Sequence, residues 1–344
     1  MPDVAAAESH YQLVGAEESP YSVKVRAYLR YKSLPHQWLN RAQAGELFAR
    51  HAKLPLIPLL VTPDGRGIQD STPIIEALEE IHPEPSIHPR DSVCRFVSYL
   101  LEEFADEWGN KWMFHYRWAR EADQLACSRR LAVLMAPDAD DATLDRAAAT
   151  IRERMVNRAW FVGSSPQTAR QIEESFKDTV DLLQAHLGNR AYLFGDRPAF
   201  ADFALWGQIY NAYRDPTPND ILHRRGPQVV AWIERMHEPA QQGAFEGWGS
   251  LSRTLEPLLS DQVAGLFLPW SDANARAIDA GDEAFRVRLR SGEWEQKPQK
   301  YHARSLTALR DRFRGQADNE ALNEVLERTG CLPYLVGDAA GALR

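Results

Sequence analysis

The stretch Gln69-Asp70-Ser71-Thr72 decides how the N-terminal part of this chain is interpreted. It follows an apolar segment, residues 56–61, that is typical of a β-strand, and it precedes Pro73, which favours the first turn of a helix. A helix N-terminus presents free N–H groups that attract anions, and an acidic side chain attracts cations. The stretch therefore predicts a site for an amino-acid-like ligand, with its ammonium on Asp70 and its carboxylate on Ser71.

Strands and helices alternate along the chain up to about residue 88. The periodicity of apolar residues predicts strands over residues 11–16, 36–40, 56–62 and 67–69, and helices over residues 20–32, 43–52 and 72–81. This order, a βαβ unit followed by a ββα unit, is typical of a small α/β thioredoxin-like sheet.

Beyond a proline-rich hinge, residues 82–89, apolar residues recur at helical spacing. Amphipathic segments predict helices over residues 92–120, 125–135, 142–156, 168–187, 202–212 and 227–236. The chain has 344 residues, which is enough for more than one core. We expect an α/β thioredoxin-like domain over residues 9–88, an all-helical domain over residues 89–249 and a helical C-terminal extension over residues 250–344.

Charge and composition argue against several classes of protein. The net charge of −8 leaves no basic field for a nucleic-acid backbone. Residues 1–10 lack the pattern of a signal peptide, and no apolar run is long enough to span a membrane. Cys94, Cys127 and Cys331 lie far apart, so we expect neither a dithiol motif nor a metal site. The expectation is a cytoplasmic protein that binds neither nucleic acid nor membranes.

The chain carries in order the motifs Ser19-Pro20-Tyr21-Ser22, Ile57-Pro58, Asp70-Ser71 and residues 195–203, and this series resembles that of the glutathione transferase superfamily. Ser19-Pro20-Tyr21-Ser22 resembles the start of the active-site helix in the serine and cysteine classes, and Ile57-Pro58 stands where the family has a cis-proline. Asp70-Ser71 resembles the segment that binds the γ-glutamyl end of glutathione, and residues 195–203 resemble a helix-capping segment of the helical domain. The resemblance covers residues 9–245. It implies the family's fold, glutathione as cofactor and a homodimer.

The resemblance makes Ser19 the candidate catalytic residue, with Tyr21 and Ser22 as alternates. A thiol with a pKa of about 8.5 is mostly protonated at neutral pH, and only the thiolate attacks electrophiles well. The Ser19 hydroxyl and the free N–H groups of a helix that begins at Pro20 would stabilise the sulfur anion. The alternative is that Ser19 only caps this helix. Because serine forms no mixed disulfide, conjugation, isomerisation or thiolytic cleavage is favoured over disulfide reduction.

Two further binding contacts follow from the same resemblance. A cis bond before Pro58 would turn the backbone of Ile57 toward an extended tripeptide, whereas a trans proline at a strand edge is the alternative. Pro55 and Leu56 stand where the family often has a glycine and a polar or basic residue. The contact to the glycyl end of glutathione would therefore come from another residue, with Lys53 as the first candidate and His51 and Gln43 as alternatives.

Trp108, Trp112, His115 and Tyr116 follow helical spacing along one stripe of the predicted helix 92–120. In the family this region borders the pocket for the electrophile, so the stripe is the candidate substrate pocket. The alternative is that the stripe belongs to the core or to an interface. The aromatic residues of the extension also predict packing, either as a buttress or dimer contact or as a lid over the pocket.

Together these observations predict a glutathione transferase-like enzyme with a role in detoxification. It would hold the thiol of glutathione as a thiolate for attack on a small, aromatic or hydrophobic electrophile. A glutathione-dependent isomerase or ether-cleaving enzyme is the first alternative. A non-catalytic interaction module on the same fold is the second, favoured by Pro55, Leu56 and the long extension, whereas the intact Asp70-Ser71 pair favours an enzyme.

Overall fold

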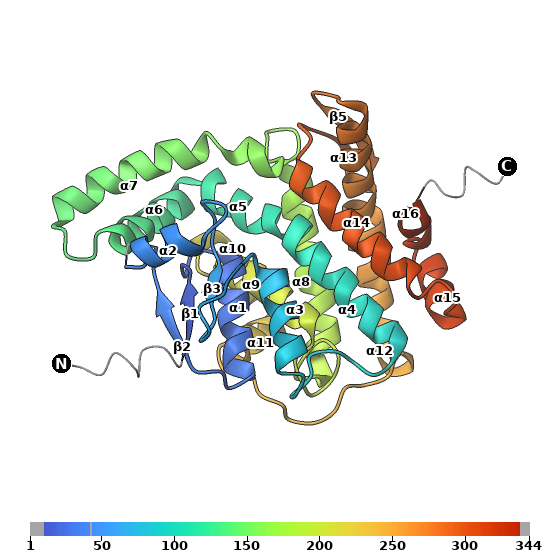
Figure 1. Cartoon of the computed structure of the whole chain (residues 1–344). Helices are drawn as coiled ribbons and strands as arrows, with labels where there is room; N and C mark the ends of the chain where they lie inside the picture. Colours follow the sequence, from blue (N-terminus) through green and yellow to red (C-terminus); the bar gives the residue numbers. More distant parts are fainter. Residues whose placement is uncertain (1–9, 42, 338–344) are drawn as a thin grey trace.

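A computed structural model describes residues 10–41 and 43–337 of the chain (Figure 1). Residues 1–9, which include the first residue of the predicted N-terminal domain, lie outside the described part. Across the described ranges, no helix combines the length and the apolar character that crossing a membrane requires.

The sheet of the N-terminal domain has the strand order β2-β1-β3-β4 (Figure 1). Its strands are β1 (Tyr11–Val14), β2 (His36–Leu39), β3 (Leu59–Val61) and β4 (Gly67–Gln69), and its helices are α1 (Pro20–Tyr31), α2 (Gly45–His51) and α3 (Ser71–Ile81). β1 runs parallel to β2 and antiparallel to β3, which pairs antiparallel with β4. The βαβ unit followed by a ββα unit, expected from the sequence, is confirmed.

The register of this sheet brings three connecting segments to one edge. Val14 faces Leu59 across β1 and β3, and Leu59 faces Gln69 across β3 and β4. Val14 is the last residue of β1, Leu59 the first of β3 and Gln69 the last of β4. The segment after β1, the segment before β3 and the segment after β4 therefore all lie at the same edge of the sheet.

The second domain is helical, as the sequence predicts. Its α-helices are α4 (Ser92–Phe104), α5 (Asn110–Ala119), α6 (Glu121–Met135), α7 (Asp141–Val156), α8 (Ala169–His186), α9 (Phe200–Tyr213), α10 (Pro216–Arg225) and α11 (Pro227–Arg235). A π-helical turn, Ala105–Gly109, divides the single helix expected over residues 92–120. The sequence patterns did not predict α10, although Pro216 at its first position is a helix-start signal.

The two domains meet where α1 packs against α9. A Cβ atom at Gly207 of α9 would lie 2.5 Å from the carbonyl oxygen of Pro20, so a glycine is needed for this close approach. At the start of α9, Asp202 Oδ2 accepts a hydrogen bond from the Ala199 N–H at 2.9 Å. Ala199 has no side-chain acceptor for a reciprocal bond. Asp202 Oδ1 also accepts hydrogen bonds from Leu193 N and Trp232 Nε1, which anchors this buried carboxylate.

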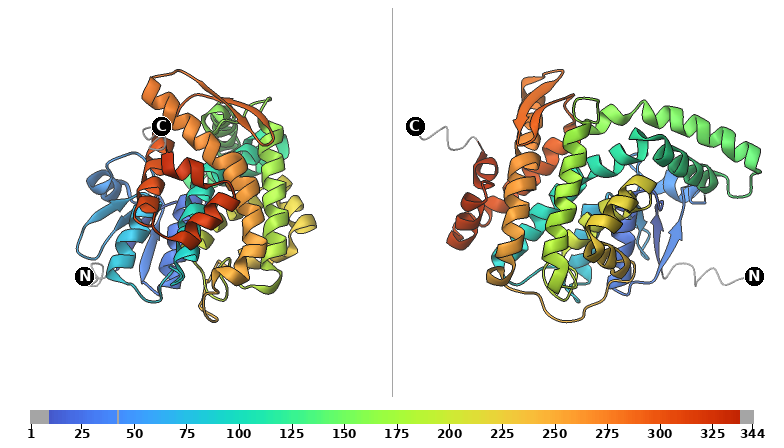
Figure 2. Two further views of the ribbon diagram at one scale, coloured as in Figure 1. Left: turned by 90° about the vertical axis from the view of Figure 1, so that its right-hand side faces the viewer. Right: turned by 180° about the vertical axis from the view of Figure 1, so that it is seen from behind.

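The C-terminal extension lies along one side of the helical domain (Figure 2). Its elements are α12 (Trp248–Leu258), a π-helix (Leu259–Phe267), α13 (Leu268–Ala280), β5 (Phe285–Leu289), β6 (Gly292–Gln296), α14 (Lys300–Arg314), α15 (Glu320–Arg328) and α16 (Leu332–Val336). α12 contacts α8, whereas α14 and α15 contact α4. The helical extension is confirmed except for one hairpin.

The hairpin of β5 and β6 is the part of the helical extension that the sequence patterns did not predict. Arg286 and Glu295 face each other across the two strands and form an ion pair at 2.7 Å, and Arg288 pairs with Glu293 at 3.0 Å. Apolar residues alternate with these charged residues, and such a period of two is the sequence signal of a half-buried strand.

Candidate functional site

The N-terminus of α1 lies at the shared sheet edge and is capped by Ser19. The Ser19 hydroxyl oxygen accepts a hydrogen bond from Ser22 N at 3.2 Å, and Pro20 occupies the first helical position. This contact uses a lone pair of the hydroxyl and leaves its proton available for donation. Of the two alternates, Ser22 is buried, and the Tyr21 hydroxyl donates to the backbone carbonyl of Asp106 at 2.9 Å. Of Ser19, Tyr21 and Ser22, Ser19 is therefore the residue that caps the helix.

The N-terminus of α3 lies beside the cis peptide Ile57-Pro58 at the same edge. Asp70 N donates to the carbonyl oxygen of Pro58 at 3.1 Å, and Asp70 Oδ1 accepts from Ser71 N at 2.7 Å. Asp70 has φ 84°, a region that non-glycine residues adopt mainly at functional or strained positions. Ser71 is fully buried, and its hydroxyl lies 3.5 Å from Asp106 Oδ2.

A buried lysine on α1 connects the two helix ends. Lys24 Nζ lies 2.5 Å from Glu102 Oε1 and 2.7 Å from Asp106 Oδ2, and it donates to the Thr72 hydroxyl of α3 at 3.1 Å. Burial raises the pKa of Asp106 to about 7, and the charge of the neighbouring Glu102 adds to this effect, whereas Lys24 opposes it. The sequence analysis missed this cluster. A charged residue inside the apolar stretch Val23–Val25 was the available signal.

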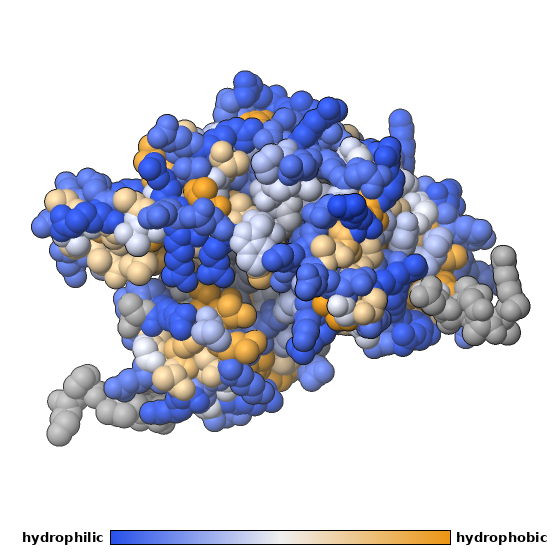
Figure 3. Space-filling view, turned by 90° about the horizontal axis from the view of Figure 1, so that it is seen from above, coloured by the Kyte–Doolittle hydropathy of each residue, from blue (hydrophilic) through white to orange (hydrophobic). Residues whose placement is uncertain are grey.

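Residues 53–56 are held beside the site by the side chain of Gln69. Its Oε1 accepts from the backbone N–H groups of Lys53 and Leu54, both at 3.0 Å, and its Nε2 donates to the carbonyls of Leu54 and Leu56. Leu54 and Leu56 are exposed, and Figure 3 shows apolar side chains gathered over the N-terminal domain. The Lys53 side chain is also exposed, and its contact to a glycyl carboxylate stays a prediction.

The residues expected to line a substrate pocket lie in the packed interior instead. Trp108, Trp112 and Tyr116 are fully buried, and His115 is nearly so. The indole N–H groups of Trp108 and Trp112 both donate to the Ser175 hydroxyl, at 2.8 and 3.0 Å. The structure therefore corrects the pocket interpretation in favour of the alternative, a core stripe. Large aromatic side chains at helical spacing more often bury their area in a core.

The polar contacts of His115 are also internal to the helical domain. Its Nδ1 lies 2.8 Å from the Ser164 hydroxyl, and its Nε2 lies 3.3 Å from Glu173 Oε1. Burial lowers the pKa of His115. These contacts explain how a histidine is accommodated in the core stripe, and they give it no exposed face toward a substrate.

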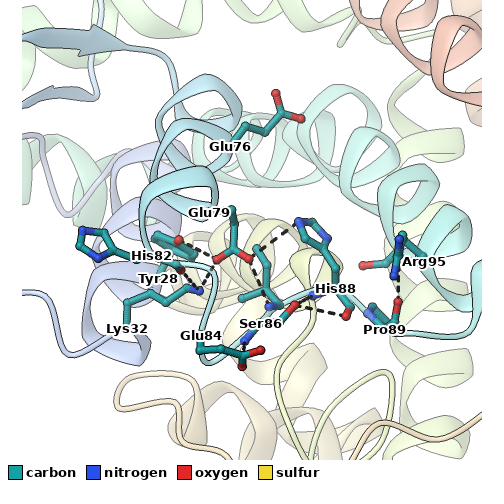
Figure 4. Close-up of polar contacts among 12 residues, drawn as sticks. Tyr28, Lys32, Glu76, Glu79, His82, Glu84, Ser86, His88, Pro89 and Arg95 are labelled. Carbon is teal, nitrogen blue, oxygen red and sulfur yellow. Dashed lines mark hydrogen bonds and ion pairs between the residues drawn. The ribbon is translucent and has the colours of Figure 1, made fainter.

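A second polar cluster lies at the far end of α3 (Figure 4). Glu79 accepts a hydrogen bond from the Tyr28 hydroxyl of α1 at 2.7 Å and pairs with Lys32, the residue that follows α1. It also accepts from the N–H of Ile87 in the hinge at 3.5 Å. Nearby, burial lowers the pKa of His88 to about 4. Glu79 and His88 line a cleft of about 960 Å³, and the contacts of Glu79 tie the hinge to α1 and α3.

The extension also contributes a residue to the sheet edge. The hydroxyl of Tyr301, in the first turn of α14, donates to Asp70 Oδ2 at 2.9 Å. The two residues are 231 positions apart in the chain, so local sequence patterns carried no signal for this contact.

Two family models match this chain. The glutathione S-transferase N-terminal domain model matches residues 18–81, and the C-terminal domain model matches residues 138–235. The first match contains Ser19, Ile57, Asp70 and Ser71, and it includes α1 and α3. α4 and the extension lie outside both matches.

Three curated relatives show similarity at low identity. A probable glutathione S-transferase, GSTU6, from Oryza sativa subsp. japonica is 27% identical over 110 residues, which cover 30% of this chain and 46% of that protein. Failed axon connections from Drosophila melanogaster is 24% identical, with 69% and 57% covered. Maleylacetoacetate isomerase from Dictyostelium discoideum is 25% identical, with 60% and 82% covered. The chain thus spans about half the length of the first two relatives.

Among solved structures, a glutathione S-transferase from Methylobacterium radiotolerans in complex with glutathione sulfonate aligns with a TM-score of 0.39 and 20% identity. The alignment covers 71% of this chain and 94% of that structure. The two family models match in the order of the two domains described above. Residues 18–81 and 138–235 of this chain belong to the glutathione transferase superfamily.

Proposed function

We propose that this protein is a glutathione-dependent transferase whose site lies at the sheet edge between α1 and α3. The observation that carries the proposal is the register that aligns Val14, Leu59 and Gln69 and so gathers Ser19, Ile57 and Asp70 at one edge. The second substrate is a small, aromatic or hydrophobic electrophile. A cytoplasmic homodimer is part of the proposal, on the basis of the family.

The donors and acceptors of the site fit the two ends of the amino acid part of glutathione. Asp70 supplies a carboxylate for the α-ammonium, and the N-terminus of α3 supplies N–H groups for the α-carboxylate. Ser71 N already bonds to Asp70 Oδ1. Asp70 must therefore exchange that bond when a ligand carboxylate arrives. The backbone of Ile57 would pair with the extended peptide.

The chemistry that glutathione supplies is a nucleophilic thiolate. Ser19 would donate its hydroxyl proton in a hydrogen bond to the sulfur, and the free N–H groups at the start of α1 would add the positive end of the helix dipole. Both favour the anion without being consumed. The protein thereby positions the nucleophile and lowers the pKa of the thiol, whose proton leaves to solvent.

Two other reactions of the same site, isomerisation and ether cleavage, remain part of this proposal as alternatives to conjugation. A relative from Dictyostelium discoideum carries the name maleylacetoacetate isomerase, which supports glutathione-dependent isomerisation as a variant of the same site. Thiolytic ether cleavage would use the same nucleophile. Glutathione is regained in isomerisation and consumed in conjugation or cleavage, so the amount of free thiol after turnover distinguishes them.

A non-catalytic role is the second candidate, and one observation favours it. Asp70 and Ser71 N satisfy each other in the structure, and the Ser71 side chain is fully buried. If the bond between Asp70 and Ser71 N does not open to admit a ligand, the protein would use the fold as an interaction module.

The test is a calorimetric titration of the purified chain with reduced glutathione, run beside Asp70→Ala. We expect saturable binding that the substitution weakens by about ten- to hundredfold, since a hydrogen bond to a charged group contributes about 1.5–3 kcal/mol. Asp220→Ala is the matched control, because Asp220 pairs only locally with Arg224 on the surface of α10. Absence of binding by the unaltered protein would overturn the proposal in favour of the non-catalytic role.

A further inference from the structure

The extension places a hydrogen-bond donor on the carboxylate that the proposed function assigns to the ligand's ammonium. Tyr301 Oη donates to Asp70 Oδ2 at 2.9 Å, and Ser71 N donates to Asp70 Oδ1 at 2.7 Å. Both oxygens of Asp70 therefore have a partner within the chain. An incoming ammonium competes with the phenol for the same oxygen.

Residues that precede and follow Tyr301 in the sequence make contacts that hold it in this place. Gln299 exchanges two hydrogen bonds with the side chain of Asn274 on α13, at 3.0 and 2.7 Å. His302 is buried and bonds to Glu107 in the π-helical turn after α4. Burial lowers the pKa of His302 to about 4, so the ring is neutral and donates to this carboxylate. The start of α14 is thus anchored to two separate elements.

Contacts farther along α14 fix the same helix to the two domains. The Ser305 hydroxyl donates to Glu103 of α4, and Arg312 pairs with Glu76 of α3. Arg312 also lies over the ring of Tyr99, with its guanidinium carbon 4.2 Å from the ring centroid. α14 therefore contacts both α3 and α4, and its first turn reaches the helix end that carries Asp70.

The phenol of Tyr301 stays protonated in this environment. Burial and the neighbouring charge of Asp70 both raise the pKa of Tyr301 above its ordinary value. A neutral hydroxyl makes a weaker bond to a carboxylate than an ammonium does. A ligand with a free α-amino group can consequently displace Tyr301, whereas one without it gains nothing from the exchange. Tyr301 as a whole residue is 52% exposed, so the ring has room to move outward although its hydroxyl group is desolvated.

We propose that Tyr301 is a gate on the α3 end of the site and selects ligands that carry a free α-amino group. This inference rests on the proposed function. In the closed state the phenol occupies Asp70 Oδ2, and binding replaces the phenol by the ammonium of the γ-glutamyl residue. The extension, which lies outside both family matches, thereby adds a specificity element to the family's fold.

Removing the hydroxyl tests the gate directly. Calorimetric titration with reduced glutathione is expected to give about three- to tenfold tighter binding for Tyr301→Phe than for the unaltered protein. Tyr334→Phe is the matched control, because Tyr334 is a half-buried tyrosine on α16 of the same extension, and it is expected to leave the affinity unchanged. Unchanged or weaker binding by Tyr301→Phe would overturn the gate, and weaker binding would mean that the hydroxyl contacts the ligand.

Hydrogen exchange separates a failure of the gate from a failure of the proposed function. Amides 304–306 lie in the first turns of α14 and report on its opening. The Tyr301 hydroxyl joins this turn to Asp70, so the gate predicts modestly faster exchange of these amides in Asp70→Ala without any ligand, with the anchors at Gln299 and His302 limiting the change and Asp220→Ala unchanged. Unaltered exchange in Asp70→Ala would overturn the gate. If none of the proteins binds glutathione, the proposed function fails, and the exchange result still decides whether Asp70 holds α14 closed.

Discussion

The two helix ends at the edge of the sheet have opposite chemistry. At α1, Ser19 caps the helix with a hydroxyl that keeps a proton to donate. At α3, the cap is the carboxylate of Asp70, and Tyr301 of the extension covers its second oxygen. The first end suits an anion such as a sulfur, and the second suits an amino acid group, with the ammonium on Asp70 and the carboxylate on the helix N–H groups. A single ligand with both groups could therefore be divided between two ends that the same sheet register aligns.

Substitution of Lys24 is expected to disturb the two helix ends more than any other change considered. Lys24 joins α1 to Thr72 of α3 and pairs with Glu102 and Asp106 in the interior. Lys24→Met would leave two buried carboxylates without their cation. We expect the free energy of unfolding to fall by about 3–5 kcal/mol, the usual cost of removing one partner of a buried ion pair. Urea denaturation measures the change.

Lys177→Met is the control for this prediction. Lys177 forms a surface pair with Glu173 at 3.6 Å, and such pairs contribute about 0–1 kcal/mol. If both substitutions changed the stability by the same small amount, Lys24 would not be the link between the two helix ends.

Asp106 provides a second test of the buried cluster, because it makes the free energy of unfolding depend on pH. Burial raises its pKa to about 7 in the folded chain, against about 3.9 for an unfolded aspartate. The folded state binds the proton more tightly, so this contribution to stability is complete below pH ~4 and is lost as the pH rises through about 7. Asp106→Asn removes the titrating group while its amide keeps the shape.

We therefore expect the unaltered protein to lose more stability than Asp106→Asn between pH 5 and pH 8. Urea denaturation at several pH values within this range, on both proteins, measures the difference in slope. Equal slopes would contradict the assignment of a raised pKa to Asp106.

Local patterns predicted most of the fold because they depend on neighbouring residues. The strand and helix periods, the proline at the start of α1 and the acid before α3 are all visible within a few positions. The same patterns located Ser19 and Asp70, and the pairing of strands then placed them at one edge. The π-helical turn after α4 was not visible, because its residues continue the helical spacing.

Contacts between distant residues explain what the sequence left undecided. Tyr301 reaches Asp70 across 231 positions, and Lys24 reaches Asp106 across 82. Neither pairing has a local pattern. The stripe of Trp108 and Trp112 had a clear period but an ambiguous meaning, because a helix face can border a pocket or a core. The indole contacts to Ser175 decide for the core.

The central claim is that the α1 end acts on the sulfur and the α3 end acts on the amino acid group. Titrating the thiol of bound glutathione by its ultraviolet absorbance, in the unaltered protein, Ser19→Ala and Asp70→Ala, tests this claim most directly. We predict that Ser19→Ala raises the pKa of the bound thiol with little change in affinity, whereas Asp70→Ala weakens binding with little change in that pKa. If both substitutions changed the same quantity, or if neither changed anything, the division of one ligand between the two helix ends would be contradicted.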